Sequence, residues 1–264
     1  MYPKIETAVV ISDVHVPFQD EHSLASLRKF LYDFQPDYFI INGDFYDFYG
    51  ISRFVKNPHR TQGGLQKELD LGYLVMKWLI DVIPNAKKVL VEGNHEERWG
   101  KFLKSDPNLM SLNSLNLLDN LRITDLGVEY SINSYMLHGL LIKHGTYYNL
   151  HSVWKELTDE GCNGTSGHIH RVQMNARTYR SKTNIWVSTG HLADESLMDY
   201  TQTGKKVTNH QQSFNVYYFI PDKEVIQPVP VVLKNHSFIF NGKYYVPQRR
   251  HLKSYTNILQ SLNV

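Results

Sequence analysis

Five short groups of polar residues in this 264-residue sequence carry side chains of the types that can bind metal ions. They are Asp13-Val14-His15, Gly43-Asp44-Phe45-Tyr46-Asp47, Gly93-Asn94-His95-Glu96, His144-Gly145 and Gly167-His168-Ile169-His170. Together they offer carboxylates, imidazoles and one carboxamide, and donors of this kind suit Mn²⁺, iron, Zn²⁺ or Ni²⁺. The donors are too many for one ion. Two ions about 3.5–4 Å apart that share one carboxylate would use them all, and such a pair clamps both oxygens of a phosphoryl displacement.

Each group comes directly after a short apolar run that is typical of a buried strand. The runs end at Ser12, Asn42, Glu92, Lys143 and Ser166. In an open α/β sheet the ligand crevice lies beyond the carboxyl ends of the strands, so we expect the five groups to converge. Taken singly, each group has an ordinary explanation as a helix cap, a turn or a hydrogen-bonded histidine. Their shared position favours one metal site.

The segments between these groups alternate helical and strand patterns, which predicts an α/β layer architecture. Apolar spacing predicts helices over 24–34, 65–83, 109–121 and 152–160, and strands over 8–12, 38–42 and 88–92. Tyr135–Leu137 and Leu140–His144 are expected to form a hairpin that turns at His138-Gly139.

From Gln173 onwards the pattern turns to β structure. Two short strands flank Ser181–Asn184, two longer ones over 213–220 and 225–232 flank the Pro221–Glu224 turn, and Asn241-Gly242 predicts a hairpin. We therefore expect a catalytic core over residues 1–190 and a C-terminal β-rich extension over 191–264 that packs on the same domain. The polar stretch over 192–212 is predicted to be a loop or a linker.

The composition limits the class of protein further. A hydrophobic content of 42% is too high for a disordered chain, and a net charge of +2 gives no general indication of a nucleic-acid or membrane binder. Because Cys162 is the only cysteine, the chain by itself holds neither an internal disulfide nor a cysteine-based metal site. No signal peptide and no apolar run of about 18 residues is evident, so we expect a soluble cytoplasmic protein without a membrane partner.

The five motifs, in this order and between these strands, resemble the calcineurin-like metallophosphoesterase superfamily from Asp13 to His170. The resemblance implies a four-layer α/β/β/α sandwich, two divalent metal ions with Mn²⁺ as the first choice, and hydrolysis of phosphomonoesters or phosphodiesters by a hydroxide that the two metals share. Carried over residue by residue, it gives Asp13, His15 and His170 to the first metal, Asn94, His144 and His168 to the second, and Asp44 to both. It also implies that His95 protonates the leaving oxygen, with Asp47 orienting its ring.

Two positions depart from one branch of this superfamily. Its protein Ser/Thr phosphatases have an arginine directly after the second aspartate and another directly before the Gly-Asn-His, where this sequence has Phe48 and Glu92. Because arginine is the bidentate phosphate clamp, the two replacements argue against that branch. The segment Ser213–Tyr218 and the Gly190-His191-Leu192 turn are similar to the tail of phosphoesterases from phage and mobile-element genomes.

We expect a phosphodiesterase that acts on nucleic acid or nucleotides. The alternatives are a phosphomonoesterase on a small metabolite and a non-catalytic interaction scaffold. Arg98, Arg53 and His191 are candidate substrate contacts, as are Lys56, His59 and Arg60 in the loop that contains Arg53, although each also fits an ordinary surface or turn position. The sequence does not indicate the oligomeric state.

The last forty residues add a basic segment that contains no acidic side chain. Its cations and aromatic residues are typical of a grip on single-stranded nucleic acid, and they fit a half-buried hairpin with solvated lysines equally well. They are Lys243, Arg249, Arg250 and Lys253 with Tyr244, Tyr245 and Tyr255. Five other histidines are expected at the surface: His22, His59, His210, His236 and His251.

Overall fold

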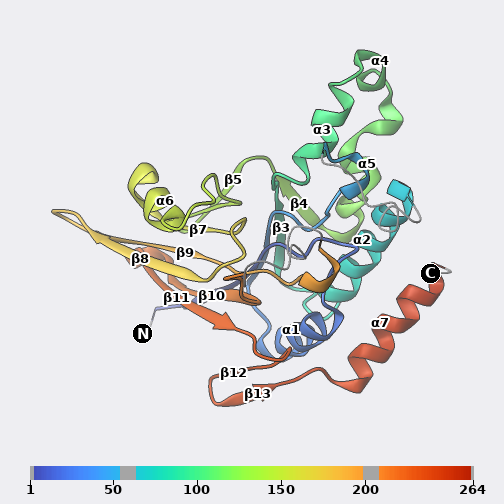
Figure 1. Ribbon diagram of the computed structural model, residues 1–264. Helices are drawn as coiled ribbons and strands as arrows, with labels where there is room; N and C mark the ends of the chain where they lie inside the picture. Colours follow the sequence, from blue (N-terminus) through green and yellow to red (C-terminus); the bar gives the residue numbers. More distant parts are fainter. Residues whose placement is uncertain (1–2, 54–63, 199–207, 263–264) are drawn as a thin grey trace.

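The computed structural model describes residues 3–53, 64–198 and 208–262. Its larger sheet has six strands in the order β11-β10-β1-β2-β3-β4 (Figure 1). Strands β1 (Glu6–Ile11), β2 (Tyr38–Asn42), β3 (Lys87–Val91) and β4 (Val128–Ser131) run parallel. Next to β1 lies the antiparallel β10 (Ser213–Ile220), followed by β11 (Val225–Val232). Strands from the expected core and from the expected extension therefore share one sheet.

The second sheet has five strands in the order β5-β6-β7-β9-β8. They are β5 (Ser134–Leu137), β6 (Leu140–Lys143), β7 (Asn163–Ser166), β8 (Gln173–Thr178) and β9 (Thr183–Ser188). Strands β5 and β6 form the predicted hairpin, in which His138 and Gly139 take φ values of 48° and 84° as its tight turn requires. Strands β6, β7 and β9 run parallel, so the ends of β6 and β7 point the same way.

The two sheets pack face to face, and helices cover both outer faces. Ala8, Val10 and Ile40 of the larger sheet form one buried cluster with Leu140 and Ile142 of the smaller. Helices α1 (Glu21–Phe34) and α2 (Gly64–Ile80) pack on the outer side of the larger sheet, and α6 (Ser152–Glu160) packs on the smaller one. The predicted four-layer α/β/β/α sandwich is confirmed (Figure 1).

The predicted helix over 109–121 is wrong, because the segment is broken into short pieces. They are α4 (Pro107–Met110), a 3-10 turn over Asn113–Leu115 and α5 (Leu117–Leu121), preceded by α3 (Glu97–Leu103) and followed by a 3-10 turn over Ile123–Leu126. Asp106 caps α4 and Asn116 caps α5 through side chains that accept backbone N–H groups. Asp106 precedes the predicted helix, whereas Asn116 starts a new helix inside it, where the apolar spacing is continuous.

The C-terminal segment is only partly β structure. Strands β12 (Phe238–Phe240) and β13 (Lys243–Tyr245) form the predicted hairpin, but helix α7 (Arg249–Ser261) was not predicted. Helix α7 contacts α1 and α2, and its Tyr255 is buried beside the Trp78 ring. Three further 3-10 turns cover Tyr49–Ile51, Glu195–Leu197 and Pro221–Lys223. Within the described ranges, no helix combines the length and apolar character that a bilayer span requires.

Candidate metal centre

The predicted ligands follow the carboxyl ends of β1, β2 and β7 in an unusual backbone conformation. Asp13, His15, Asp44, His168 and His170 all have φ values between 52° and 69°. This left-handed region is sparsely populated by residues other than glycine and costs of the order of 1 kcal/mol per residue. Strain of this kind persists where the surrounding structure enforces it, and it gathers at functional sites.

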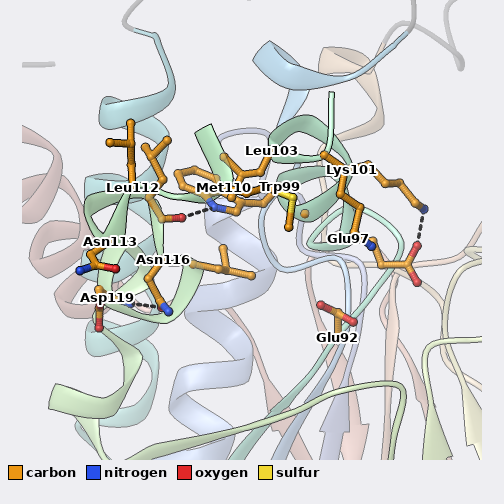
Figure 2. A pocket seen from close by; sticks show the side chains of 14 residues that line it. Glu92, Glu97, Trp99, Lys101, Leu103, Met110, Leu112, Asn113, Asn116 and Asp119 are labelled. Carbon is orange, nitrogen blue, oxygen red and sulfur yellow. Dashed lines mark hydrogen bonds and ion pairs between the residues drawn. The ribbon is translucent and has the colours of Figure 1, made fainter. Parts of the chain in front are cut away.

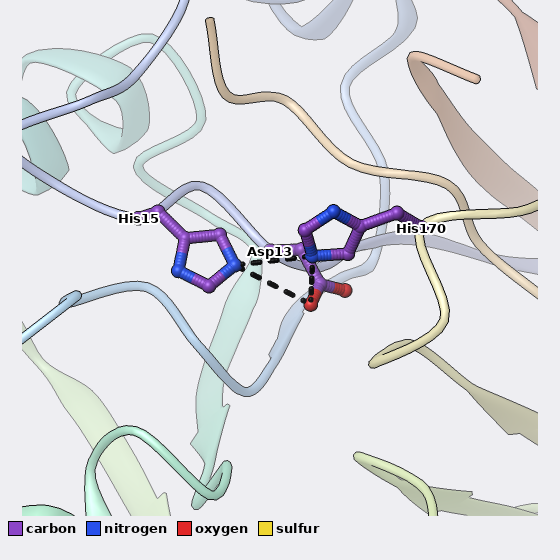
Figure 3. A group of neighbouring side chains, drawn as sticks. All are labelled: Asp13, His15 and His170. Carbon is purple, nitrogen blue, oxygen red and sulfur yellow. Dashed lines mark hydrogen bonds and ion pairs between the residues drawn. The ribbon is translucent and has the colours of Figure 1, made fainter. Parts of the chain in front are cut away.

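The first group consists of Asp13, His15 and His170, which are all buried (Figure 3). Asp13 Oδ1 lies 3.1 Å from His170 Nε2 and 3.7 Å from His15 Nε2. The two Nε2 atoms are 3.2 Å apart, so both rings present a nitrogen to the same carboxylate oxygen. This convergence is what a shared cation requires.

The second group contains Asp44, His144 and His168, whose ligand atoms lie within 4.8 Å of one another. His144 Nε2 is 3.0 Å from Asp44 Oδ2, and His144 Nδ1 donates to the Asn42 carbonyl at 2.8 Å. Because that bond occupies Nδ1, Nε2 is the nitrogen left for a metal. Asp44 also lies within the same 4.8 Å limit of His15, which places its carboxylate between the two groups.

Buried polar atoms in both groups show that these residues fit a pair of metal ions. Asp13 Oδ1, Asn94 Oδ1 and His144 Nε2 make no hydrogen bond of normal geometry within the described part of the chain. Leaving such atoms unsatisfied is costly, and a bound cation satisfies them. Asn94 lines a cavity of about 380 Å³ together with His15, Asp44 and His168, so the two groups open into one space.

The electrostatics of the metal-free site show how tightly the groups are coupled. Burial opposes ionisation of Asp44, but the charges of His144 and His95 hold the pKa of Asp44 well below its usual range. Burial likewise opposes protonation of His144, yet the Asp44 and Asp13 carboxylates raise the pKa of His144 to about 10. Without metal, protonated imidazoles therefore balance the buried carboxylates, and a divalent cation can take their place.

Asp47 contacts both a predicted ligand and the predicted acid. Its carboxylate Oδ2 lies 3.1 Å from His15 Nδ1, which directs His15 Nε2 towards Asp13. His95 Nδ1 donates to the backbone carbonyl of Asp47 at 2.8 Å, and it lies 3.4 Å from the Asp47 carboxylate. Asp47 therefore contacts the His95 ring mainly through its carbonyl. That it orients this ring for catalysis stays a prediction.

The three predicted substrate contacts have different surroundings. Arg98 donates to the Asp47 carbonyl at 2.7 Å, and its second terminal nitrogen is 2.8 Å from His95 Nε2. Arg53 is exposed and lines a cavity of about 470 Å³ with Arg98 and Asn94. His191 is buried and stacks on the His170 ring at 5.1 Å, so it packs against a predicted ligand. Lys56, His59 and Arg60 lie outside the described residues.

Two residues near the site were missed or misplaced by the sequence analysis. His210, expected at the surface, is half-buried and lines the cavity beside His170, with 5.2 Å between the ring centroids. Glu96 is fully buried, and its carboxylate accepts the N–H groups of Gly93, Asp44, Phe45 and Tyr46 at 2.8–3.0 Å. The Gly-Asn-His-Glu motif itself was the available signal for Glu96.

A further buried carboxyl, Glu68 on α2, lies beneath the Asp47 loop and accepts the Phe48 N–H. Burial and the neighbouring Asp47 charge raise the pKa of Glu68 to about 8, above its ordinary value of 4.5. The protonated Glu68 side chain therefore contributes fully to the free energy of unfolding below pH 4.5. This contribution is lost as the pH rises through 8. Glutamine does not titrate, so Glu68→Gln should remove this pH dependence. Between pH 5 and pH 8 the free energy of unfolding should fall by roughly 2 kcal/mol less in the variant than in the wild type. Urea unfolding of the metal-free protein at several pH values measures the difference.

The exposed Glu129, which pairs with Lys87, provides the matched control for that measurement. Glu129→Gln should follow the wild-type pH dependence. If the free energy of unfolding changed with pH equally in Glu68→Gln and in the wild type, Glu68 would be ionised in the folded protein.

A separate cavity of about 680 Å³ lies between α3 and α5 (Figure 2). Trp99 forms part of its wall and donates to the Leu115 carbonyl at 2.8 Å, while Met110 and Leu112 are exposed at its edge. It contains none of the predicted metal ligands, so it is distinct from the cavity that both ligand groups share.

A four-layer sandwich with two clusters of histidine and aspartate at its strand ends is the architecture of a metal-dependent phosphoesterase. The chain belongs to the calcineurin-like phosphoesterase family, whose model matches residues 7–216. Membership supports metal-dependent phosphoester hydrolysis and leaves the substrate open. No curated protein is similar enough in sequence to match the chain.

Several solved structures are similar to this chain at low sequence identity. A metallophosphoesterase from Sphaerobacter thermophilus is 14% identical, with a TM-score of 0.46 and coverage of 99% of this chain and 95% of that one. Vacuolar Protein Sorting 29 from Cryptosporidium parvum is 16% identical, with a TM-score of 0.42 and coverage of 92% and 95%. An archaeal phosphodiesterase is 14% identical, with a TM-score of 0.40 and coverage of 86% and 99%.

Proposed function

We propose that the protein is a two-metal phosphodiesterase that acts on nucleotides or nucleic acid. The observation that supports this most directly is the position of Asp44 between two buried ligand groups that open into one cavity. In this proposal Asp13, His15 and His170 hold one metal, Asn94, His144 and His168 hold the other, and Asp44 bridges them. Bound divalent metals supply a nucleophile from water near neutral pH and absorb charge on the phosphoryl oxygens. Mn²⁺ as the metal and a cytoplasmic location stay predictions.

His95 is the group of this chain that meets the leaving oxygen. Its Nδ1 is held by the Asp47 carbonyl, so Nε2 faces the Arg98 guanidinium and the cavity. Nε2 accepts from Arg98 here. When substrate enters, Arg98 can move to a phosphate oxygen, and Nε2 can then take up a proton from solvent and pass it to the leaving alcohol. Fixing the far nitrogen of an imidazole in this way is what a general acid needs.

His95→Ala tests this role separately from metal binding. We expect kcat for bis-p-nitrophenyl phosphate to fall by about 100-fold, which is typical for loss of a general acid. Elemental analysis should find the same metal content as in the wild type. Loss of metal in this variant would make His95 a ligand instead.

The replacement of two arginine positions favours diesters over monoesters. At the two positions where protein phosphatases carry arginine, Phe48 is buried against Tyr46 and Trp99, and Glu92 accepts the Tyr130 hydroxyl at 2.9 Å. Neither can clamp a phosphate. A dianionic monoester depends more on such cations than a monoanionic diester does. A phosphomonoesterase and a non-catalytic scaffold stay as the alternatives.

The basic C-terminal segment contributes less to this proposal than its sequence suggests. Tyr245 and Tyr255 are buried in the core, and Lys243 pairs with Asp33 on α1. Buried rings cannot stack on bases. Lys243, Tyr244 and Tyr245 lie on the predicted hairpin, whereas Tyr255 lies on helix α7, which neither explanation included.

Hydrolysis of nitrophenyl esters tests the proposed function as a whole. Purified protein loaded with Mn²⁺, Ni²⁺, Zn²⁺ or Mg²⁺ should hydrolyse bis-p-nitrophenyl phosphate faster than p-nitrophenyl phosphate, and chelation should stop both reactions. The reverse order of rates would favour the monoesterase. Absence of turnover with every metal would favour the scaffold.

A further inference from the structure

The cavity that both ligand groups share has a rim that includes three side chains outside the predicted metal ligands. They are Tyr148, Arg171 and His210. Tyr148 lies in the loop between β6 and α6, Arg171 directly follows His170, and His210 precedes β10. Three separate segments therefore bring an aromatic ring, a guanidinium and an imidazole to one opening.

Tyr148 is the most exposed large aromatic residue among those described, with 81% of its surface accessible. Its position is nevertheless defined, because Arg171 Nη2 donates to the carbonyls of Tyr148 and Asn149 at 3.3 and 2.9 Å. An accessible ring on a tethered loop beside a polar cavity provides a surface on which a planar group can stack.

Arg171 and His210 add polar groups beside that ring. Arg171 adds a positive charge at the same opening, where its Nη2 is held by the two loop carbonyls. Glu195 contacts His210 Nδ1, which fixes the ring and leaves Nε2 as its second hydrogen-bonding atom. The backbone also fixes His210, because the adjacent Gln211 N–H donates to the His170 carbonyl at 2.9 Å.

The rim is separate from the predicted leaving-group side of the cavity. The polar partners of the His95 side chain are Asp44, Asp47 and Arg98, and its ring packs on that of His15. None of the three rim residues is among them. A phosphodiester carries one alcohol that leaves and one that stays bonded to phosphorus. If the leaving alcohol lies at His95, the alcohol that stays can reach the rim.

We propose that Tyr148, Arg171 and His210 form a binding subsite for a nucleoside on the non-leaving side of the phosphodiester. The base stacks on Tyr148, and Arg171 and His210 bond to the polar atoms of the nucleoside. This proposal rests on the proposed phosphodiesterase function and assigns its specificity. It involves no change in the chemical step.

Two esters with the same leaving group test the subsite. Thymidine 5′-monophosphate p-nitrophenyl ester and ethyl p-nitrophenyl phosphate both release p-nitrophenolate and differ only in the group that stays on phosphorus. The wild type should prefer the thymidine ester in kcat/KM by about tenfold or more, the usual gain from stacking one base. Tyr148→Ala should remove most of this preference through a higher KM for the thymidine ester, and Tyr148→Phe should restore it.

Tyr244→Ala is the matched control, because Tyr244 is 63% exposed and lies on the β13 hairpin. This variant should keep the wild-type preference. If Tyr244→Ala loses it, or if Tyr148→Ala slows both esters equally, the subsite is wrong. If the wild type hydrolyses neither ester with any metal, the proposed function fails instead.

Discussion

Asp44→Asn should lower the hydrolysis of bis-p-nitrophenyl phosphate by about 1000-fold or more, because one carboxylate lies between both ligand groups. The substitution keeps the side-chain shape and removes the negative charge that offsets two cations. Metal content measured by elemental analysis should fall below two ions per chain. The fold should persist, since the Asp44 N–H still donates to Glu96 at 2.8 Å.

Asp222→Asn in the exposed turn before β11 is the matched control and should retain wild-type turnover and metal content. Circular dichroism of both variants separates loss of the site from loss of the fold. Full turnover in a folded Asp44→Asn protein would show that Asp44 does not bridge metals in the reaction.

The ligand groups were predictable because their chemistry and their place in the fold are both local signals. Apolar runs predicted β1, β2 and β3 to within two residues at each end, and the polar residues after them converge as the topology requires. The antiparallel β10 beside β1 brings the C-terminal segment to the same region, which places His210 at the cavity. Because His210 reaches the cavity through pairing of strands far apart in the sequence, the residues around it do not predict this position.

Tertiary contacts also explain the elements that were missed. Helix α7 has few apolar residues, and it is stabilised by contacts with α1 and α2, among them the packing of Tyr255 on Trp78, which no local propensity reveals. The prediction of one helix over 109–121 is wrong for a local reason, because the cap at Asn116 starts a new helix in the middle of a continuous apolar pattern. The tyrosines of the basic segment were ambiguous because spacing alone does not distinguish a stacking ring from a buried one.

Glu96→Gln should weaken metal binding by about 100-fold and lower the free energy of unfolding by roughly 3 kcal/mol. The Glu96 carboxylate accepts four N–H groups from the loops after β2 and β3, and these loops carry Asp44 and Asn94. The loops approach so closely that a Cβ at Gly93 would lie 2.3 Å from Asp44 Oδ1. A glutamine side chain has one acceptor oxygen and turns an NH₂ group towards backbone donors, so buried N–H groups lose their partner.

Two further variants separate a positioning role for Glu96 from general destabilisation. Glu96→Asp keeps the charge and should recover part of the metal affinity, measured by calorimetry on the metal-free protein. Glu97→Gln, next in sequence but only half-buried and paired with Lys101, should match the wild type in both measurements. If Glu96→Gln lost stability but bound metal as tightly as the wild type, the Asp44 loop would hold its geometry without this carboxylate. Loss of affinity in the folded variant therefore identifies Glu96 as the residue that positions the bridging aspartate.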